Sequence, residues 1–360
     1  MVVDRADLIA GAIYGMALGD SWGFLTEFMQ HPDILATKPL PPRRLQITDD
    51  TQMSLYNARA LRQILQEEDN LDFLLVDEEQ QVRIRKIFAD FHLDYEIDPD
   101  NNRAPGRTVM SALYNYRRSD QLTGLEGSSS NDSKGCGTIM RSPWFGLLPL
   151  DRRIIAALAV LQSETTHGHP QAALSAAVAA LMLHDIFEGE LSPIDAAPKN
   201  RVLAMLYRTL SYATEVEELP TGLVATERFR GGVSDFRETV YELIYSFEHV
   251  SNEDLMNPDQ DICSWFGEGW TADAALLCSV GAFALHDFQS YEGIRRLVYS
   301  NGDSDSIGAI GGSFFGALLG YGVLERQAAE YSVSIRGAFE YRYEQELSDA
   351  LGFYRELNRS

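Results

Sequence analysis

Small residues recur inside stretches of helical periodicity, and this pattern constrains the fold more than any other. A glycine inside a helix costs about 1 kcal/mol relative to alanine, yet five glycines occur from Gly308 to Gly320. A second such stretch, from Ala172 to Ala180, is rich in alanine. Small residues let neighbouring helix backbones approach closely. Both stretches are therefore predicted to be central helices of a crowded bundle.

Apolar residues at helical spacing dominate the rest of the chain, and strand-like alternation is scarce. Without a repeat of fixed period or a charged linker, we expect one all-α domain over residues 1–360, with a motif-bearing core at about 8–322. Four segments are predicted to be irregular: residues 30–46, 67–79, 124–137 and 215–234. The predicted helices cover residues 8–18, 51–67, 80–94, 107–118, 152–163, 171–188, 201–213, 271–287, 291–300 and 307–321.

Composition argues against several classes of partner. The formal net charge of −23 argues against a nucleic-acid backbone or an anionic membrane. Three scattered cysteines without a CxxC pair indicate reduced thiols and a cytoplasmic protein. Asp4 and Asp7 occupy positions where a signal peptide carries positive charge. The longest apolar stretch, Ala172 to Leu183, is shorter than the roughly 20 residues that span a bilayer. The chain is predicted to be soluble.

Two short acidic clusters stand out as candidate ligands for a metal ion. The first acidic cluster is Thr48-Asp49-Asp50-Thr51, and the second acidic cluster is Asp303-Ser304-Asp305-Ser306. They offer carboxylates and hydroxyls but no thiolate or imidazole, a set that suits Mg2+ or Mn2+ rather than zinc. If the fold brings the clusters together, their oxygens are numerous enough for two ions.

Each cluster also has a simpler interpretation as the cap of a helix. Asp49 and Gln52 have the spacing of a capping box. The second acidic cluster matches part of a calcium EF-hand loop, but Ile307 and Phe314 stand at two of its ligand positions. Because both clusters share one form, the metal interpretation is favoured.

A polar and then glycine-rich segment, residues 128–138, is a candidate phosphate-binding loop, with a flexible surface loop as the alternative. It is not a P-loop, because Lys134 precedes the glycine. His167 and His169 lack a nearby third zinc ligand, so a capping or phosphate-contacting role is favoured. The residues alone thus indicate a hard-metal enzyme or a hard-metal-binding protein.

Six motifs, in order, resemble those of the ADP-ribosylglycohydrolases, and together they extend over nearly the whole chain. One such motif would be weak evidence, whereas six in order are strong. They are Gly15-Met16-Ala17-Leu18-Gly19-Asp20-Ser21-Trp22-Gly23 with Glu27-Phe28, Thr48-Asp49-Asp50-Thr51-Gln52-Met53, Pro105-Gly106-Arg107-Thr108, Gly135-Cys136-Gly137-Thr138-Ile139-Met140-Arg141, Thr166-His167-Gly168-His169 and Gly302-Asp303-Ser304-Asp305-Ser306-Ile307-Gly308.

The resemblance implies an all-α fold with a dinuclear Mg2+ or Mn2+ site. Glu27 would lie beside the metals and act on the attacking water or the ribose hydroxyls, and Asp305 would serve both as ligand and in catalysis. The implied metal ligands are Thr48, Asp49, Asp50, Asp303, Asp305 and Ser306. The implied ADP-ribose contacts are Gly106, Gly135, Cys136, Gly137, Thr138 and His167.

The chain departs from the family pattern at two places. Cys136 replaces the usual asparagine of the glycine-rich loop, and we expect this to weaken only a polar contact. Ser304 and Ser306 replace the usual threonines, and serine keeps the hydroxyl oxygen. Ligation by the second acidic cluster is therefore expected to survive.

The expected activity is removal of ADP-ribose from a modified protein side chain, with ADP-ribosylarginine favoured. Serine linkages, O-acetyl-ADP-ribose and modified nucleobases stay open. An alternative function is that of an immunity protein that binds a cognate ADP-ribosyltransferase toxin, since an acidic surface suits docking on a basic partner. A catalytically inactive scaffold is disfavoured because the acidic ligands are intact.

Overall fold

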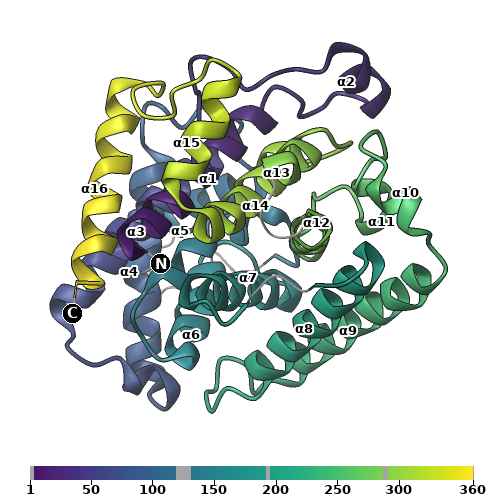
Figure 1. The fold of residues 1–360 in the computed structure, drawn as a ribbon. Coiled ribbons are helices and arrows are strands. Elements are labelled where there is room, and N and C mark those ends of the chain that lie inside the picture. The colour runs from purple at the N-terminus through teal and green to yellow at the C-terminus, as the bar shows by residue number, and fades with distance from the viewer. Residues whose placement is uncertain (1–3, 119–130, 192–194, 287–290, 360) are drawn as a thin grey trace.

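The computed structural model describes residues 4–118, 131–191, 195–286 and 291–359, and these ranges contain helices and no strand (Figure 1). The predicted all-α class is confirmed. The elements are α1 (Arg5–Gly23), α2 (His31–Thr37), α3 (Asp49–Glu67), η1 (Asp72–Leu75), α4 (Glu78–Glu96), α5 (Arg107–Arg118), η2 (Cys136–Thr138), η3 (Pro143–Leu147), α6 (Arg152–Ser163), α7 (Pro170–Glu188), α8 (Pro198–Glu217), α9 (Glu227–Glu248), α10 (Asn252–Met256), α11 (Cys263–Phe266), α12 (Ala272–Leu285), α13 (Tyr291–Val298), α14 (Ser304–Leu319), α15 (Tyr321–Glu330) and α16 (Tyr341–Leu357).

Each helix predicted from periodicity corresponds to an observed one, with ends that differ by a few residues. The irregular segment predicted at residues 215–234 is wrong at both ends, because α8 continues to Glu217 and α9 begins at Glu227. The segments 30–46 and 67–79 contain α2 and η1. Residues 119–130, which include much of the predicted loop 124–137, lie outside the described ranges.

The centre of the bundle is the antiparallel pair of α1 and α14, whose backbones are in direct contact (Figure 1). A Cβ on Gly15 would lie 2.2 Å from the carbonyl oxygen of Gly312, and one on Gly19 would lie 2.0 Å from that of Gly308. Small residues at every fourth position are what make this approach possible. We call the set the glycine ladder, and its pairs are Gly11 with Gly316, Gly15 with Gly312, Gly19 with Gly308, and Gly23 with Ser304.

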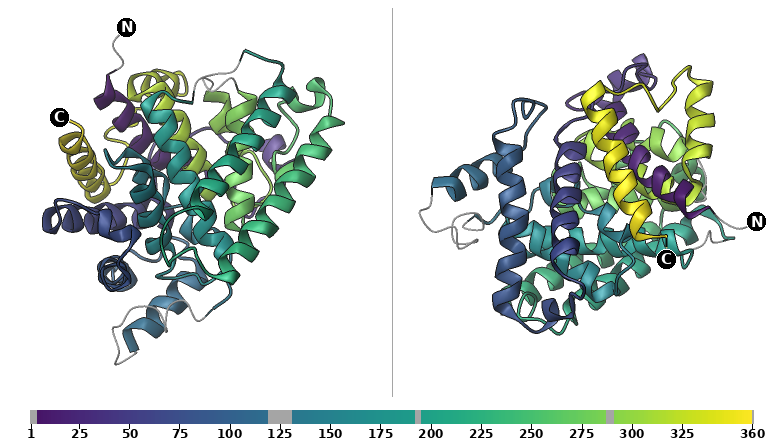
Figure 2. Two further views of the ribbon diagram at one scale, coloured as in Figure 1. Left: turned by 90° about the horizontal axis from the view of Figure 1, so that it is seen from below. Right: turned by 90° about the vertical axis from the view of Figure 1, so that its left-hand side faces the viewer.

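The alanine-rich helix α7 is also buried, and it packs against α6, α8, α9, α12 and α14. By length and composition it could cross a membrane, but 89% of its most apolar 18-residue window is buried inside the structure. Burial all round is the arrangement of a core helix. Figure 2 shows α16, in yellow, on the outside of the bundle, where it packs against α1 and α3.

Three helix ends meet at one place because of this packing. The glycine ladder sets the C-terminal end of α1 beside the N-terminal end of α14. The turn after α1 is fastened there by Thr26, whose hydroxyl bonds to the carbonyl of Val298 and to the hydroxyl of Ser304. The N-terminal end of α3 is tied to α1 by Asp20, which accepts hydrogen bonds from the amide and hydroxyl of Thr48. This meeting point forms the site.

Candidate active site

The first acidic cluster forms the start of α3, and its carboxylates are not used as helix caps. The N-cap is Thr48, whose hydroxyl accepts a hydrogen bond from the amide of Asp50. The capping box considered as the alternative for Asp49 and Gln52 is not formed, and the Gln52 amide instead donates to the carbonyl of Asp100. Asp49 and Asp50 lie in the first turn, where the positive end of the helix dipole favours carboxylates.

The second acidic cluster starts α14 in a similar way. Asp303 is the N-cap residue, but its side chain accepts no capping hydrogen bond from the helix backbone. Its amide donates to the carbonyl of Glu268, which holds the start of the helix against the preceding loop. Asp305 lies in the first turn and accepts a hydrogen bond from the amide of Ser306. The carboxylate of Asp303 is thereby left to face other partners.

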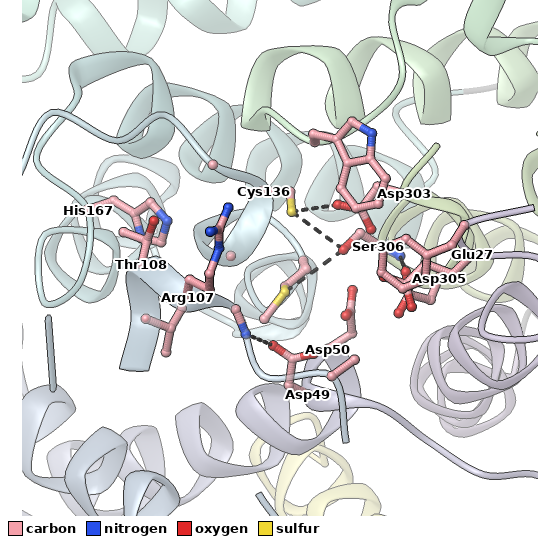
Figure 3. Close-up of a pocket in the computed structure, with 18 residues that line it drawn as sticks. Glu27, Asp49, Asp50, Arg107, Thr108, Cys136, His167, Asp303, Asp305 and Ser306 are labelled. Atoms are coloured by element: carbon pink, nitrogen blue, oxygen red, sulfur yellow. Dashed lines mark hydrogen bonds between the residues drawn. The ribbon is translucent and has the colours of Figure 1, made fainter. Parts of the chain in front are cut away.

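Both acidic clusters line one cavity of about 390 Å3 (Figure 3). This volume lies in the range of small-molecule binding sites. Of the residues predicted for the site, Thr48 and Thr138 are not among those that line the cavity, and both are buried. The lining residues are Glu27, Phe28, Asp49, Asp50, Ala104, Gly106, Arg107, Thr108, Val109, Gly135, Cys136, Gly137, Met140, His167, Trp270, Asp303, Asp305 and Ser306.

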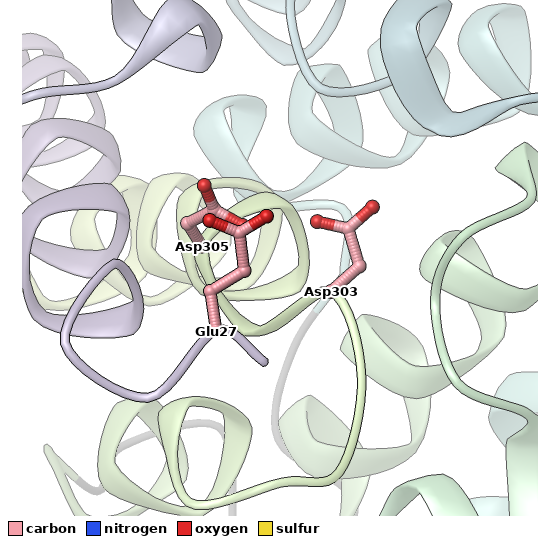
Figure 4. Close-up of side chains that lie close together, drawn as sticks. All are labelled: Glu27, Asp303 and Asp305. Atoms are coloured by element: carbon pink, nitrogen blue, oxygen red, sulfur yellow. The ribbon is translucent and has the colours of Figure 1, made fainter. Parts of the chain in front are cut away.

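Carboxylates gather at one end of the cavity. Glu27, Asp303 and Asp305 each place an oxygen within 4.8 Å of the others (Figure 4). Burial and then the charges of Asp305 and Asp49 raise the pKa of Glu27 to about 9. Burial and mutual repulsion also raise the pKa of Asp49, Asp50 and Asp303 well above the usual range. So many buried like charges require either protons or a cation.

The donor atoms at this end fit a hard metal ion. Asp50 Oδ1 and Glu27 Oε2 are buried and have no hydrogen-bond partner among the described residues. Buried polar atoms normally have a partner, so an unpaired carboxylate oxygen indicates a missing ligand. Carboxylate oxygens are the donors that Mg2+ and Mn2+ prefer. The three carboxylates that lie closest together include Glu27. The resemblance implied that Glu27 lies beside the metals and is not one of their ligands.

The opposite end of the cavity carries His167, held by a buried chain of hydrogen bonds (Figure 3). Arg141 donates to the hydroxyl of Thr166, and that hydroxyl lies 2.9 Å from Nδ1 of His167. Burial and the charge of Arg141 lower the pKa of His167 to about 3, so the ring is neutral. The Thr166 hydroxyl joins Arg141 to Nδ1 of the ring, and it can donate to Nδ1 or accept from it according to the tautomer of His167. Thr166 engages Nδ1, so Nε2 is the ring nitrogen left to contact a ligand.

The glycine-rich loop packs directly on this histidine. A Cβ on Gly135 would lie 3.2 Å from His167 Nε2, and one on Gly137 would lie 3.1 Å from Cε1 of the same ring. The amide of Gly135 already donates to the hydroxyl of Ser133, and the amide of Cys136 donates to the carbonyl of Trp270. Two of the amides expected to hold phosphate are therefore engaged within the chain.

Cys136 lies closer to the carboxylates than the sequence suggested. Its thiol donates a hydrogen bond to Asp303 Oδ2 at 2.8 Å, and Ser306 Oγ lies 3.7 Å from its sulfur. Burial and the charge of Asp303 raise the pKa of the thiol well above its usual value, so it stays protonated. The expected loss of a polar contact in the loop is thus accompanied by a new contact with the second acidic cluster.

Several residues of the site were missed from the sequence, among them Asp20 and Arg107. Asp20 is buried and joins α1 to the first acidic cluster, since it accepts hydrogen bonds from Thr48 and Thr51. Arg107 lines the cavity near Thr108 and brings a positive charge to an otherwise acidic site (Figure 3). Both residues lie inside motifs already recognised, so their positions in those motifs were the available signal.

The fold and the cavity define an all-α protein with a cluster of buried carboxylates that could hold a metal ion. The family model for ADP-ribosylglycohydrolases matches residues 1–343, and the chain belongs to this family. A solved structure described as an ADP-ribosylglycohydrolase-related protein complex is 22% identical, covers 98% of each chain and superposes with a TM-score of 0.59. That likeness bears on the fold alone. None of the curated proteins matches the chain. Membership of the family supports hydrolase activity of the ADP-ribosylglycohydrolase type.

Proposed function

We propose that the protein hydrolyses the bond between ADP-ribose and a protein side chain, with ADP-ribosylarginine as the favoured substrate. The observation that carries the proposal is the division of one cavity into two ends. Carboxylates of both acidic clusters gather at one end, while Arg107 and the neutral His167 lie at the other. An ADP-ribosyl group has matching parts, namely a ribose with hydroxyls and an anionic pyrophosphate.

The end with Arg107 supplies the contacts for the pyrophosphate. A guanidinium forms paired hydrogen bonds with phosphate oxygens, and the neutral ring of His167 adds a polar contact through Nε2. The hydroxyls of Thr108 and Ser133 lie 3.1 Å apart at the same end and offer further donors. Together these groups offset the repulsion that an anionic ligand would meet in a protein of net charge −23.

The carboxylate end would hold the ribose and the reacting bond. Two Mg2+ or Mn2+ ions held by Asp49, Asp50, Asp303 and Asp305 would neutralise the clustered charges, lower the pKa of Glu27 and orient the ribose hydroxyls. The hydroxyls of Thr48 and Ser306 are the further ligands that the sequence suggests.

Glu27 is the group placed to move a proton. Its carboxylate faces Asp305 across the cavity end, and in the ionised form it accepts a proton from the attacking water (Figure 4). The water oxygen bonds to the anomeric carbon, the carbon–nitrogen bond of the arginine conjugate breaks, and the departing nitrogen takes a proton. Free ADP-ribose and the unmodified side chain result.

The experiment is to incubate the protein with a mono-ADP-ribosylated arginine peptide and to measure free ADP-ribose with Mg2+, with Mn2+ and with EDTA. We expect release that depends on the metal and that falls at least roughly a hundredfold in Glu27→Gln, the range of a lost general base. Glu238→Gln, an exposed change on α9, is the matched control. Equal release by Glu27→Gln and the control would refute the assigned role.

The same assay with a serine-linked peptide separates the two protein linkages. Release from serine at the arginine rate would argue against the favoured substrate. No contact or cavity among the described residues singles out a surface for a toxin, so the immunity role stays a prediction from the sequence.

A further inference from the structure

A stacked pair of aromatic side chains lines the cavity and is open to solvent. The rings of Phe28 and Trp270 have centroids 5.7 Å apart and an interplanar angle of 21°. Phe28 is 74% exposed and Trp270 is 40% exposed, and both line the cavity. Large aromatic rings that stay exposed at the edge of a cavity are a common mark of a binding surface.

The backbone holds Phe28 in this position in spite of strain. Its φ is 64°, a region that residues with a Cβ seldom adopt. The surrounding turn is fixed, because the amide of Met29 donates to the carbonyl of Thr26, and Thr26 is bonded to Val298. Strained residues that a rigid surrounding maintains are concentrated at functional sites.

Trp270 is held from two sides of the site. Its carbonyl accepts a hydrogen bond from the amide of Cys136 in the glycine-rich loop. The preceding residue, Gly269, has φ 80°, and a Cβ there would lie 3.3 Å from the Cβ of Asp303. These contacts fix the backbone at Trp270 relative to both the loop and the second acidic cluster.

The aromatic pair belongs to the carboxylate end of the cavity. Phe28 directly follows Glu27, and the carbonyl of Trp270 is bonded to Cys136, whose thiol donates to Asp303. Figure 3 shows Glu27, Asp303 and Asp305 on the side of the cavity away from His167. A ligand whose pyrophosphate lies near His167 therefore places its reacting bond, and the group beyond that bond, near the aromatic pair.

We propose that Phe28 and Trp270 form the subsite for the departing side chain and that this subsite prefers the guanidinium of arginine. The proposal rests on the hydrolase function proposed above. A guanidinium is planar and cationic, so it stacks on aromatic faces and is attracted to them. Glu268, two residues before Trp270 in the chain, is exposed and adds a carboxylate to the same segment. A serine linkage presents neither a plane nor a charge.

The test compares three ligands in wild type, Phe28→Leu, Trp270→Leu and the control Tyr241→Leu, which changes an aromatic residue 56% exposed on α9. The ligands are an ADP-ribosylarginine peptide, an ADP-ribosylserine peptide and free ADP-ribose. We expect Trp270→Leu to lower kcat/KM for the arginine peptide roughly fivefold, the size of an exposed cation–π contact. The Kd for ADP-ribose and the turnover of the serine peptide stay within about twofold, since neither uses the stacked cation. Circular dichroism verifies that each variant is folded.

Three results would overturn the proposal. An equal loss in ADP-ribose binding would mean that the pair stacks on the adenine ring. Equal losses on the arginine and serine peptides would remove the preference for guanidinium, and unchanged kinetics in both variants would remove the subsite.

Measurements of ligand binding test this proposal separately from the hydrolase function. If wild type releases ADP-ribose from neither peptide, the hydrolase proposal fails, and calorimetry then compares the Kd of the arginine peptide with that of ADP-ribose. Tighter binding of the peptide in wild type that disappears in Trp270→Leu supports the subsite. Equal binding of the two ligands in wild type overturns it.

Discussion

The contact between α1 and α14 predicts that Gly15→Ala destabilises the protein although it improves helix propensity. An alanine Cβ at this position would lie 2.2 Å from the carbonyl oxygen of Gly312 and 3.3 Å from the Cα of Gly316. The nearest obstacle is backbone, which cannot rotate away as a flexible side chain can. The two helices must separate locally to admit the methyl group.

The expected magnitude follows from two opposing effects. Overpacking a well-packed core costs typically 1–3 kcal/mol, and a backbone obstacle places this case at about 3 kcal/mol. Alanine gains about 1 kcal/mol over glycine in a helix. The net loss in the free energy of unfolding is therefore about 2 kcal/mol. The matched control is Gly231→Ala on α9, where an added Cβ meets nothing within 4 Å. It is expected to stabilise the protein by up to about 1 kcal/mol.

Urea unfolding of the three proteins, followed by far-ultraviolet circular dichroism, measures both values. Opposite signs for the two substitutions would support backbone contact along the glycine ladder. If Gly15→Ala were as stable as Gly231→Ala, the helices could not be as close as the structure shows, and the account of how the site is assembled would be refuted.

Three further predictions concern the site. The first concerns the Tm in EDTA. The pKa of Glu27 is raised from 4.5 to about 9, so between these pH values the folded state holds a proton that the unfolded state releases. The Tm should therefore fall as the pH rises from 4.5 to about 9, and it should fall less in Glu27→Gln. The second is that Mg2+ or Mn2+ raises the Tm of wild type. In calorimetry, Asp303→Asn should weaken metal binding at least roughly tenfold, whereas the exposed change Asp235→Asn should leave it unchanged. Arg107→Ala should weaken ADP-ribose binding in calorimetry roughly tenfold, the value of a charge-assisted hydrogen bond, whereas Arg118→Ala on the same helix should not.

The sequence predicted the buried helices well because their composition departs most from the average. Among the helices that were not predicted, α9 carried a usable signal as well. Along α9 the buried residues Phe229, Val233, Phe236 and Val240 recur at helical spacing. The adjacent glycines Gly231 and Gly232 obscured it, because glycine normally indicates a loop. Gly232 is in fact required by packing, since a Cβ there would lie 2.5 Å from the ring of Pro170.

The chemistry of the site was more predictable than its geometry. Residue types alone indicated hard-cation ligands in both acidic clusters. The contact of Cys136 with Asp303 could not be predicted, because it depends on how a loop residue lies against a helix far away in the chain. The sequence carries a signal for the pairing of α1 with α14, since glycines recur at every fourth position from Gly11 to Gly23 and from Gly308 to Gly320. This spacing places the small residues of each helix on one face, and two such faces can pack closely against each other.

Glycine spacing alone does not determine the register of the two central helices. A slip by one helical turn would still place glycines opposite glycines along most of the ladder, because both sets repeat every four residues. Polar contacts at the two ends exclude the slip. At one end the Thr26 hydroxyl bonds to Ser304, and at the other the Asp7 carboxylate accepts a hydrogen bond from the amide of Gly322. These contacts fix the position of the turn that carries Glu27. The Glu27 carboxylate therefore lies against the start of α14. The glycines therefore determine how closely the helices pack, while the hydrogen bonds at their ends determine which carboxylates meet.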